Sequence, residues 1–285
     1  MILNQRGAVY HLDLLPEELA STVITVGDPG RVEEVSRYFD KTEHRSMHRE
    51  FVTHTGYIGK KRLSVVSTGI GTDNIDIVLT ELDALMNVDL KTRTVKPELN
   101  SLRIVRMGTC GGLQADVPTD AMVISSYGLG LDNLLNFYKH TPDIEEEAML
   151  KAFMDHTALS ASMASPYLSR ADLSLLNAFK KQGHHTGITV TCPGFYAPQG
   201  RQIRAMPAFP QLLDILPGFR FADHRILNFE METAGIYGLG KILGHACLSI
   251  STVVANRAAG TFSTDAGKAV QHMIEKSLEV LMSLP

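Results

Sequence analysis

Cysteine is scarce in this sequence, and its distribution argues against both a disulfide framework and a metal centre. The chain has 285 residues and three cysteines, Cys110, Cys192 and Cys247. An odd number of widely separated cysteines is typical of reduced thiols in a cytoplasmic protein. No two of them have the short spacing of a zinc-binding pair. We therefore expect free thiols and no bound metal.

The sequence also lacks an excess of basic residues and any long hydrophobic segment. The formal net charge is −4, which gives no positive surface for a nucleic acid or an anionic membrane. The segment Met1–Arg6 lacks the hydrophobic core of a signal peptide, and no apolar run approaches the roughly 18–20 residues of a membrane span. We expect a cytoplasmic protein without nucleic-acid or membrane partners.

Repeats, low-complexity tracts and domain linkers are absent as well, so residues 1–285 are predicted to form one domain. With 44% apolar and 20% charged residues, the chain has the composition of a soluble globular protein. A chain of this length buries a substantial core. The composition favours an enzyme that acts on a small molecule.

Short β-branched segments alternate with segments of helical periodicity along most of the chain. Because the predicted strands are apolar throughout, helices are expected to cover both faces of the sheet. This pattern predicts an α/β protein with a three-layer α/β/α fold and a central twisted sheet that is mixed but mostly parallel. The predicted strands are residues 22–26, 63–66, 102–107, 121–124, 187–190 and 246–254; predicted helices begin near residues 31, 72 and 233 or span residues 145–156, 167–182 and 264–281.

Three stretches predict irregular structure. The strand at 102–107 is expected to close on a glycine-rich turn at 108–112. Residues 87–101 are polar and aperiodic, which indicates a surface loop. Residues 205–225 contain three prolines and three phenylalanines and predict a flexible, partly apolar flap.

Two arginines lie where predicted strands end. Gly27-Asp-Pro-Gly-Arg31 joins a strand to a helix, and such a turn offers backbone N–H groups and a positive helix end to an anion. Arg31 adds a fork of donors that matches phosphate oxygens. The motif lacks the Gly-Lys-Ser/Thr ending of a P-loop and by itself indicates only a turn. Arg106 lies in an apparently buried strand, where an arginine needs an anionic partner, either a ligand or an ion-pair partner.

Two further motifs carry hydrogen-bonding chemistry. In Phe195-Tyr-Ala-Pro-Gln199-Gly-Arg201, the amide and guanidinium match a flat heterocycle with an imide N–H and two carbonyls, although an ordinary loop is the alternative. Glu230 and Glu232 flank Met231 and would share one face of a strand. They are either an acid/base pair, as in a glycosidase, or solvated carboxylates at an edge. All these residues follow strand carboxyl ends, where open α/β sheets bind ligands.

The ordered set of motifs covers nearly the whole chain and is specific, although each motif alone is weak. The segments are Tyr10-His-Leu12, Gly27-Asp-Pro-Gly-Arg31, His48-Arg-Glu-Phe51, Ser67-Thr-Gly-Ile-Gly71, Arg106-Met-Gly-Thr109, Phe195-Tyr-x-x-Gln199-x-Arg201, Phe229-Glu-Met-Glu-Thr233 and Asn256-Arg257. Together they resemble the nucleoside phosphorylase-I family and, within it, the uridine phosphorylases. The resemblance implies a pentosyltransferase that converts uridine and phosphate into uracil and ribose 1-phosphate.

The resemblance also implies the role of each site residue, with Arg106, Glu232 and Arg201 as the main catalytic groups. The ribose would be contacted by Met231 and Glu232, with Glu230 close by. The phosphate site would comprise Gly27, Arg31, Arg106, Thr109 and Arg49 from a neighbouring subunit; the base site would comprise Phe195, Gln199, Arg201 and, through water, Arg257. His11 of the neighbour would reach the ribose 5′-hydroxyl. Such two-way sharing implies a homodimer, with a hexamer as the larger form known in the family.

The chain departs from the family pattern at several positions. Cys110 stands where a small hydroxyl residue is usual, and Thr72-Asp-Asn74 replaces Gly-Pro-Ser beside the interface potassium site around Glu50. No cofactor is expected apart from phosphate as co-substrate. Purine enzymes of the family carry an aspartate near the end of the last long strand, whereas here Ala255-Asn256-Arg257 has no acid. A pyrimidine substrate is therefore favoured; a purine phosphorylase, a nucleosidase and a non-catalytic nucleoside-binding protein are the alternatives.

Overall fold

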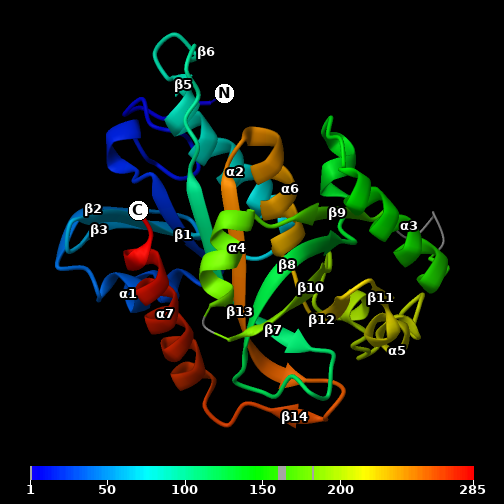
Figure 1. Ribbon diagram of the computed structural model, residues 1–285. Coiled ribbons are helices and arrows are strands. Elements are labelled where there is room, and N and C mark those ends of the chain that lie inside the picture. The colour runs from blue at the N-terminus through cyan, green and yellow to red at the C-terminus, as the bar shows by residue number, and fades with distance from the viewer. Residues whose placement is uncertain (1, 160–164, 182) are drawn as a thin grey trace.

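The computed structural model describes residues 2–159, 165–181 and 183–285. The described strands of the main sheet are β1 (Thr22–Val26), β2 (Lys41–His48), β3 (Phe51–Ile58), β4 (Lys61–Ser67), β7 (Arg103–Gly112), β8 (Met122–Gly130), β9 (Tyr167–Arg170), β10 (His185–Thr191), β11 (Arg220–Phe221), β12 (His224–Glu230), β13 (Ala246–Asn256) and β14 (Thr261–Phe262). They lie in the order β11-β12-β10-β8-β13-β7-β1-β4-β3-β2, with β9 beside β8 and β14 beside β13 (Figure 1).

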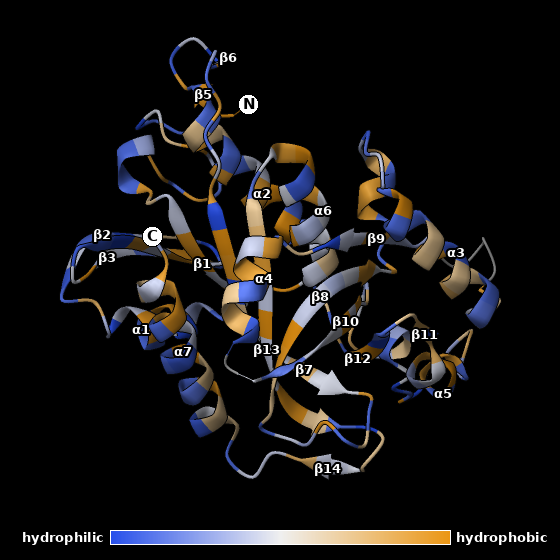
Figure 2. Cartoon of the chain, in the orientation of Figure 1, coloured by the Kyte–Doolittle hydropathy of each residue, from blue (hydrophilic) through white to orange (hydrophobic). Residues whose placement is uncertain are grey.

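The sheet is mixed, as predicted. Parallel pairing joins β4, β1, β7 and β13 in its centre and also joins β8, β10 and β12. The two parallel groups meet where β13 pairs antiparallel with β8, and the outer strands β2 and β11 are antiparallel to their neighbours. The hydrophobic colour in Figure 2 follows the central strands, whereas β2 at the edge is mainly hydrophilic.

Helices cover both faces of this sheet, which confirms the three-layer prediction (Figure 1). On β13, the hydroxyl of Ser249 lies 2.8 Å from that of Thr233 at the start of α6. Leu248 and Ile250 alternate with Ser249 and therefore point to the opposite face, where α4 and α7 pack against β13. The helices are α1 (Pro29–Ser36), α2 (Thr72–Asn87), α3 (Ile144–Thr157), α4 (Leu173–Lys180), α5 (Leu212–Ile215), α6 (Thr233–Leu243) and α7 (Ala266–Ser283).

Four segments differ from their predictions. The strand expected to stop before Gly108 continues as β7 to Gly112, because Gly111 and Gly112 pair with β12. The helix expected at 167–182 begins with strand β9, and α4 starts only after Asp172, whose carboxylate caps it by accepting from the Leu175 N–H. The 87–101 loop contains the small hairpin of β5 (Val88–Asp89) and β6 (Thr94–Val95), and the 205–225 flap contains α5.

The loops after the strand ends converge on one side of the sheet. Gly27 follows β1, Glu232 follows β12 and Phe195 follows β10, while β7 passes between them. Among the described residues, no helix is both long enough and apolar enough to cross a membrane.

A buried histidine links α2 to the start of β7. His245 accepts a hydrogen bond from the Leu102 N–H at Nδ1 (3.1 Å), and its Nε2 lies 3.3 Å from Asp83 Oδ1. Burial acts to raise the pKa of Asp83, but the contact with His245 Nε2 and the hydrogen bond from Asn87 outweigh it and hold this pKa below its usual value. A depressed carboxyl pKa adds stability above the unfolded-state pKa, and this stability is lost as the pH falls through the folded-state pKa.

We predict that Asp83→Asn lowers the free energy of unfolding at pH 7 by about 1–2 kcal/mol, because the charge-assisted hydrogen bonds are lost. The difference from wild type should shrink as the pH falls below about 4, where the unfolded-state aspartate protonates. Urea unfolding at pH 7, 5 and 3 measures both effects. An equal difference at all three pH values would contradict this account of Asp83.

Candidate active site

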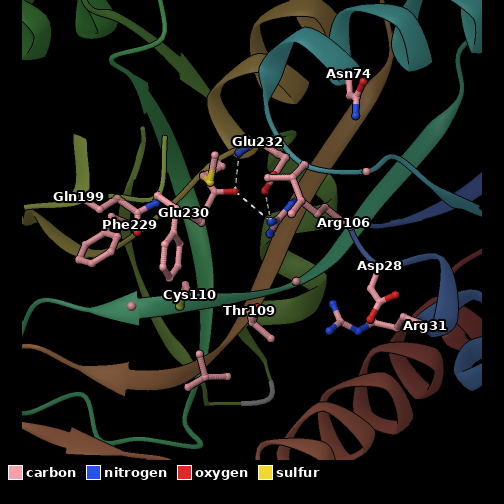
Figure 3. A pocket seen from close by; sticks show the side chains of 18 of the residues that line it. Asp28, Arg31, Asn74, Arg106, Thr109, Cys110, Gln199, Phe229, Glu230 and Glu232 are labelled. Carbon is pink, nitrogen blue, oxygen red and sulfur yellow. Dashed lines mark hydrogen bonds and ion pairs between the residues drawn. The ribbon is translucent and has the colours of Figure 1, made fainter. Parts of the chain in front are cut away.

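A cavity of about 750 Å³ opens where the strand ends converge. Figure 3 shows Gln199 and Phe229 at one end, Arg31 and Asp28 at the other, and Arg106, Glu230 and Glu232 between them. The lining residues are Gly27, Asp28, Pro29, Arg31, Glu50, Gly69, Ile70, Asn74, Arg106, Gly108, Thr109, Cys110, Gly111, Phe195, Gln199, Arg201, Phe229, Glu230, Met231, Glu232, Val254 and Ala255. The cavity therefore brings together most of the residues singled out in the sequence.

The end of the cavity near α1 is formed by the turn that contains Asp28 and Arg31. Asp28 caps α1 by accepting from the Gly30 N–H (2.8 Å), which fixes the turn before Arg31. Arg31 Nε is buried and has no hydrogen-bond partner among the described residues. Burial, reinforced by the positive charge of Arg106, lowers the pKa of Arg31. An anion bound here would supply the missing partner and relieve the repulsion between the two arginines.

Arg106 is the buried centre of the cavity. Its Nη2 forms ion pairs with Glu232 and, at 3.2 Å, with Glu230, and its Nη1 donates to the Ser251 hydroxyl at 3.2 Å. The two carboxylates outweigh the effect of burial and raise the pKa of Arg106, so the guanidinium stays charged. The anionic partner that the sequence required for Arg106 is present within the chain as two glutamates.

Space for this guanidinium depends on a glycine. The Arg106 side chain lies along β7 over Gly108, and a Cβ added at Gly108 would lie only 2.0 Å from Arg106 Nη1. Gly111 has a similar role on the same strand, since an added Cβ would lie 2.7 Å from the ring of Phe229. The glycines expected to form a turn instead give room for two side chains of the cavity.

The two glutamates after β12 have different surroundings. Glu232 accepts from the Gly71 N–H (2.9 Å) and from Arg106, whereas Glu230 accepts from Thr191, from Arg106 and from two backbone N–H groups at the start of α6. Burial raises the pKa of Glu232, aided by the charge of Glu230 and opposed by that of Arg106. Both side chains are buried, which excludes the solvated-edge interpretation.

At the far end, an aromatic ring supports a donor-rich pair. Arg201 stacks on Phe195, with Cζ 3.7 Å from the ring centroid, and its Nη1 donates to Gln199 Oε1 and to the Phe195 carbonyl at 2.6 Å each. Gln199 is buried, and its backbone carbonyl accepts a hydrogen bond from Arg257 Nη2 at 3.1 Å. Burial and the charge of Arg257 lower the pKa of Arg201. This end is suited to carbonyl oxygens of a planar ligand.

Asn256 does not offer its amide to the cavity. Its Nδ2 donates to the carbonyls of Gln114 (2.8 Å) and Val117 (2.6 Å), and its Oδ1 accepts from the Ala259 N–H (2.9 Å). Among the described lining residues, the carboxylates are Asp28, Glu50, Glu230 and Glu232, and none of them belongs to the segment around Gln199 and Arg201. The segment 195–201 therefore contributes neutral and cationic donors and no acid to the cavity.

His11, Arg49 and Arg257 are predicted site residues that do not line this cavity. His11 Nδ1 lies 2.7 Å from Glu81 Oε1 on α2, and Arg49 is exposed in the turn between β2 and β3 with φ 56°. Arg257 reaches only the backbone behind Gln199. Their positions leave the first two available to a neighbouring subunit, as the resemblance implies.

Several lining or supporting residues were not predicted from the sequence. Asp28 and Asn74 stood in segments quoted from the sequence but were given no role in the site. Ser251 carried no distinct motif, although a serine alternating with Ser249 in a buried strand marks one polar face of β13. Asn74 Nδ2 lies 3.4 Å from Glu50 Oε1, where the family pattern suggested a cation. Burial raises the pKa of Cys110 to about 12, so this thiol remains neutral in the cavity.

Comparison with known proteins defines the class. Residues 21–284 match the profile of the phosphorylase superfamily, and the chain belongs to this family. It is a pentosyltransferase of the nucleoside phosphorylase type, with a nucleoside and phosphate as its small-molecule substrates. This confirms the family, the fold and the class of enzyme predicted from the ordered motifs.

Individual relatives carry both pyrimidine and purine names. The chain is 27% identical to a uridine phosphorylase of Thermococcus kodakarensis, over 98% of this chain and 88% of that protein. It is 26% identical to a DeoD-type purine nucleoside phosphorylase of Shewanella loihica, over 97% of this chain and 100% of that protein. The crystal structure of a Trypanosoma brucei nucleoside phosphorylase with uridine phosphorylase activity matches with a TM-score of 0.90, 28% identity and 99% coverage of both chains.

We predict that Gly108→Ala lowers kcat/KM of the phosphorolysis by about 100-fold. The new methyl group would displace the Arg106 guanidinium, which would then no longer stabilise the negative charge of the reacting groups. Gly267→Ala is the matched control, since its added Cβ has no contact closer than 3.6 Å. Steady-state kinetics with varied phosphate measures the loss. Unchanged kinetics in the Gly108 variant would show that Arg106 does not act from this position.

Proposed function

We propose that the protein is a uridine phosphorylase of cytoplasmic pyrimidine salvage, which converts uridine and phosphate reversibly into uracil and ribose 1-phosphate. The observation that carries the proposal is the planar end of the cavity. There Gln199 and Arg201 present donors beside the Phe195 ring, and none of the carboxylates in the described lining belongs to the segment 195–201. Uracil offers carbonyl oxygens to such donors.

The opposite end supports phosphate as the nucleophile. The buried Nε of Arg31 has no hydrogen-bond partner in the described parts of the chain, and Arg106, Thr109 and Gly27 line the same cavity. Phosphate held there would lie beneath the ribose, with one oxygen placed to attack the anomeric carbon. Such positioning supplies roughly 7–11 kcal/mol of the barrier in well-oriented reactions.

The chemistry then needs no acid at the base. As the glycosidic bond breaks, negative charge develops on uracil and positive charge on the sugar, which the bound phosphate stabilises. Donors from Arg201 and Gln199 would stabilise the leaving uracil, and one such donor is worth about 3–4 kcal/mol. Glu232 would accept hydrogen bonds from the ribose 2′- and 3′-hydroxyls. These bonds would fix the sugar while the glycosidic bond stretches. Neither Glu230 nor Glu232 has to transfer a proton at the anomeric carbon, which replaces the glycosidase hypothesis.

We further propose a homodimer as the minimal active unit, with assembly to a hexamer as a larger form. His11 and Arg49 lie outside the cavity of their own chain and would complete the neighbour's site. Met47, two residues before Arg49, and Ile70 at the cavity are strongly exposed apolar side chains (78% and 68%), as expected of surfaces that a partner covers. Phosphate is the proposed co-substrate and no cofactor is expected, while the replacement of Gly-Pro-Ser by Thr72-Asp-Asn74 leaves an interface potassium ion in doubt.

We predict that the purified protein consumes uridine only when phosphate is present, and that it prefers uridine to inosine. The test is a panel of uridine, thymidine and inosine, each with and without phosphate, followed by chromatography of the free bases. Equal loss of uridine without phosphate would indicate a hydrolase. Preferred turnover of inosine would establish a purine phosphorylase, and binding without turnover of any nucleoside would indicate a non-catalytic protein.

We predict that Arg201→Ala lowers uridine kcat/KM by about 100–1000-fold, because a donor to the leaving uracil is removed. Phosphate binding, measured by calorimetry, should stay within about twofold, since Arg201 lies at the opposite end of the cavity. Arg204→Ala, an exposed arginine of the same segment, is the control and should leave both quantities unchanged. Loss of phosphate binding together with uridine activity would contradict the assignment of this loop.

A further inference from the structure

We propose that Glu230 is a positioning residue, and that the ribose hydroxyls are bound by Glu232 alone of the two glutamates. This inference rests on the proposed function, because it concerns how the same site holds its sugar. It gives a definite role to Glu230, which the resemblance placed only close to the ribose. This role follows from the hydrogen bonds, the charges and the position of α6.

The carboxylate of Glu230 is fully occupied by the protein. Its Oε1 accepts from the Thr191 hydroxyl (2.7 Å), and its Oε2 accepts from the backbone N–H groups of Glu232 (2.9 Å) and Thr233 (3.0 Å). Oε2 also lies 3.2 Å from Arg106 Nη2. A ribose hydroxyl would have to displace one of these donors and leave it buried without a partner, which costs about 1–3 kcal/mol.

These bonds place Glu230 at the N-terminal end of α6. The first N–H groups of a helix lack partners within the helix, and the positive end of the helix dipole favours an anion. The N-cap residue of α6 is Glu232, whose own side chain does not cap the helix. Glu230 therefore provides the cap, and it holds the backbone of Glu232 directly through the Glu232 N–H.

Glu232 has the opposite character. Its partners are the Gly71 N–H at Oε1 and Arg106 at Oε2, and its side chain points into the cavity between the two ends (Figure 3). Its backbone is fixed by Glu230, while its carboxylate exchanges Arg106 for ribose hydroxyls. During that exchange Glu230 remains beside Arg106, so the buried guanidinium keeps an anionic partner and does not incur the large cost of an unpaired charge.

Few groups among the described residues face Glu232, so the pKa of Glu232 reports on the charge of Glu230. They are Arg106 from β7, Glu230 from β12 and the backbone N–H of Gly71 before α2. Burial and the negative charge of Glu230 raise the pKa of Glu232, and Arg106 lowers it. Removing the charge of Glu230 should therefore lower this pKa, and nucleoside binding that needs ionised Glu232 should persist to lower pH.

The test compares Glu230→Gln with Glu232→Gln on uridine and 2′-deoxyuridine at saturating phosphate. Glu232→Gln should reduce uridine kcat/KM by about 100-fold and reduce the preference for uridine over deoxyuridine, because the acceptor of the 2′-hydroxyl is weakened. Glu230→Gln should reduce both substrates equally, by about 10–100-fold through misplacement of Glu232, and leave the preference within about twofold. A fall in the preference in Glu230→Gln, or unchanged uridine kinetics, would overturn the proposal.

The pH profile separates positioning from simple destabilisation. The acid limb of uridine kcat/KM should move to lower pH in Glu230→Gln. Glu146→Gln is the matched control, because Glu146 is also a buried carboxylate that caps a helix and pairs with a cation, Lys241, but it does not line this cavity. It should lower the melting temperature without moving the acid limb. An unmoved acid limb in Glu230→Gln would overturn the proposal.

A second variant keeps the proposal testable if Glu230→Gln does not fold. Thr191→Val removes one donor to Glu230 and retains its charge, so uridine and deoxyuridine should both slow while their ratio and the acid limb stay unchanged. A changed ratio would overturn the positioning role. Absence of phosphate-dependent uridine turnover in the wild type would instead refute the proposed function. If inosine is the preferred substrate, the preference for the ribonucleoside over the deoxyribonucleoside is measured with inosine and 2′-deoxyinosine. The role of Glu230 is then tested independently of the proposed uridine activity.

Discussion

The site depends on the burial of one positive charge, that of Arg106. A guanidinium in the middle of a sheet is tolerated only with anionic partners, and removing one partner of a buried pair typically costs about 3–5 kcal/mol. Glu230 and Glu232 provide these partners from a segment more than a hundred residues away in the sequence. The ion pairs therefore fix the end of β12 and the start of α6 against β7, and they place the residues proposed to bind phosphate beside those proposed to bind ribose.

Room for this arrangement comes from residues without side chains. Gly108 allows Arg106 to lie back along β7, and Gly111 allows the Phe229 ring to pack beneath the planar end of the cavity. The antiparallel contact between β12 and β7 at Phe229 and Gly111 brings these two effects together. A strand this rich in glycine is weak by propensity, and its pairing with β1, β12 and β13 compensates for that weakness.

The sequence predicted the layers, the mixed sheet and the residues at strand ends, because these follow from local periodicity and from the turn residues that end each strand. It did not predict that β7 continues through its glycines, since Gly108 to Gly112 are equally typical of a turn and only the distant β12 makes them a strand. The difference between Glu230 and Glu232 was also beyond local pattern. It depends on Thr191, on Gly71 and on the direction in which α6 begins, all of which are set by tertiary packing. Strand β2 escaped prediction because its edge position makes it polar.

The balance of charge explains why a second subunit belongs to the proposed mechanism. The described lining of the cavity holds three arginines, Arg31, Arg106 and Arg201, and four carboxylates, Asp28, Glu50, Glu230 and Glu232. A phosphate anion would therefore add negative charge to a site in which carboxylates already outnumber arginines. Arg49 is exposed on the turn after β2 and does not line the cavity of its own chain. In the proposed dimer it would enter the neighbour's site and add a positive charge there, so the proposed catalysis would require the proposed assembly.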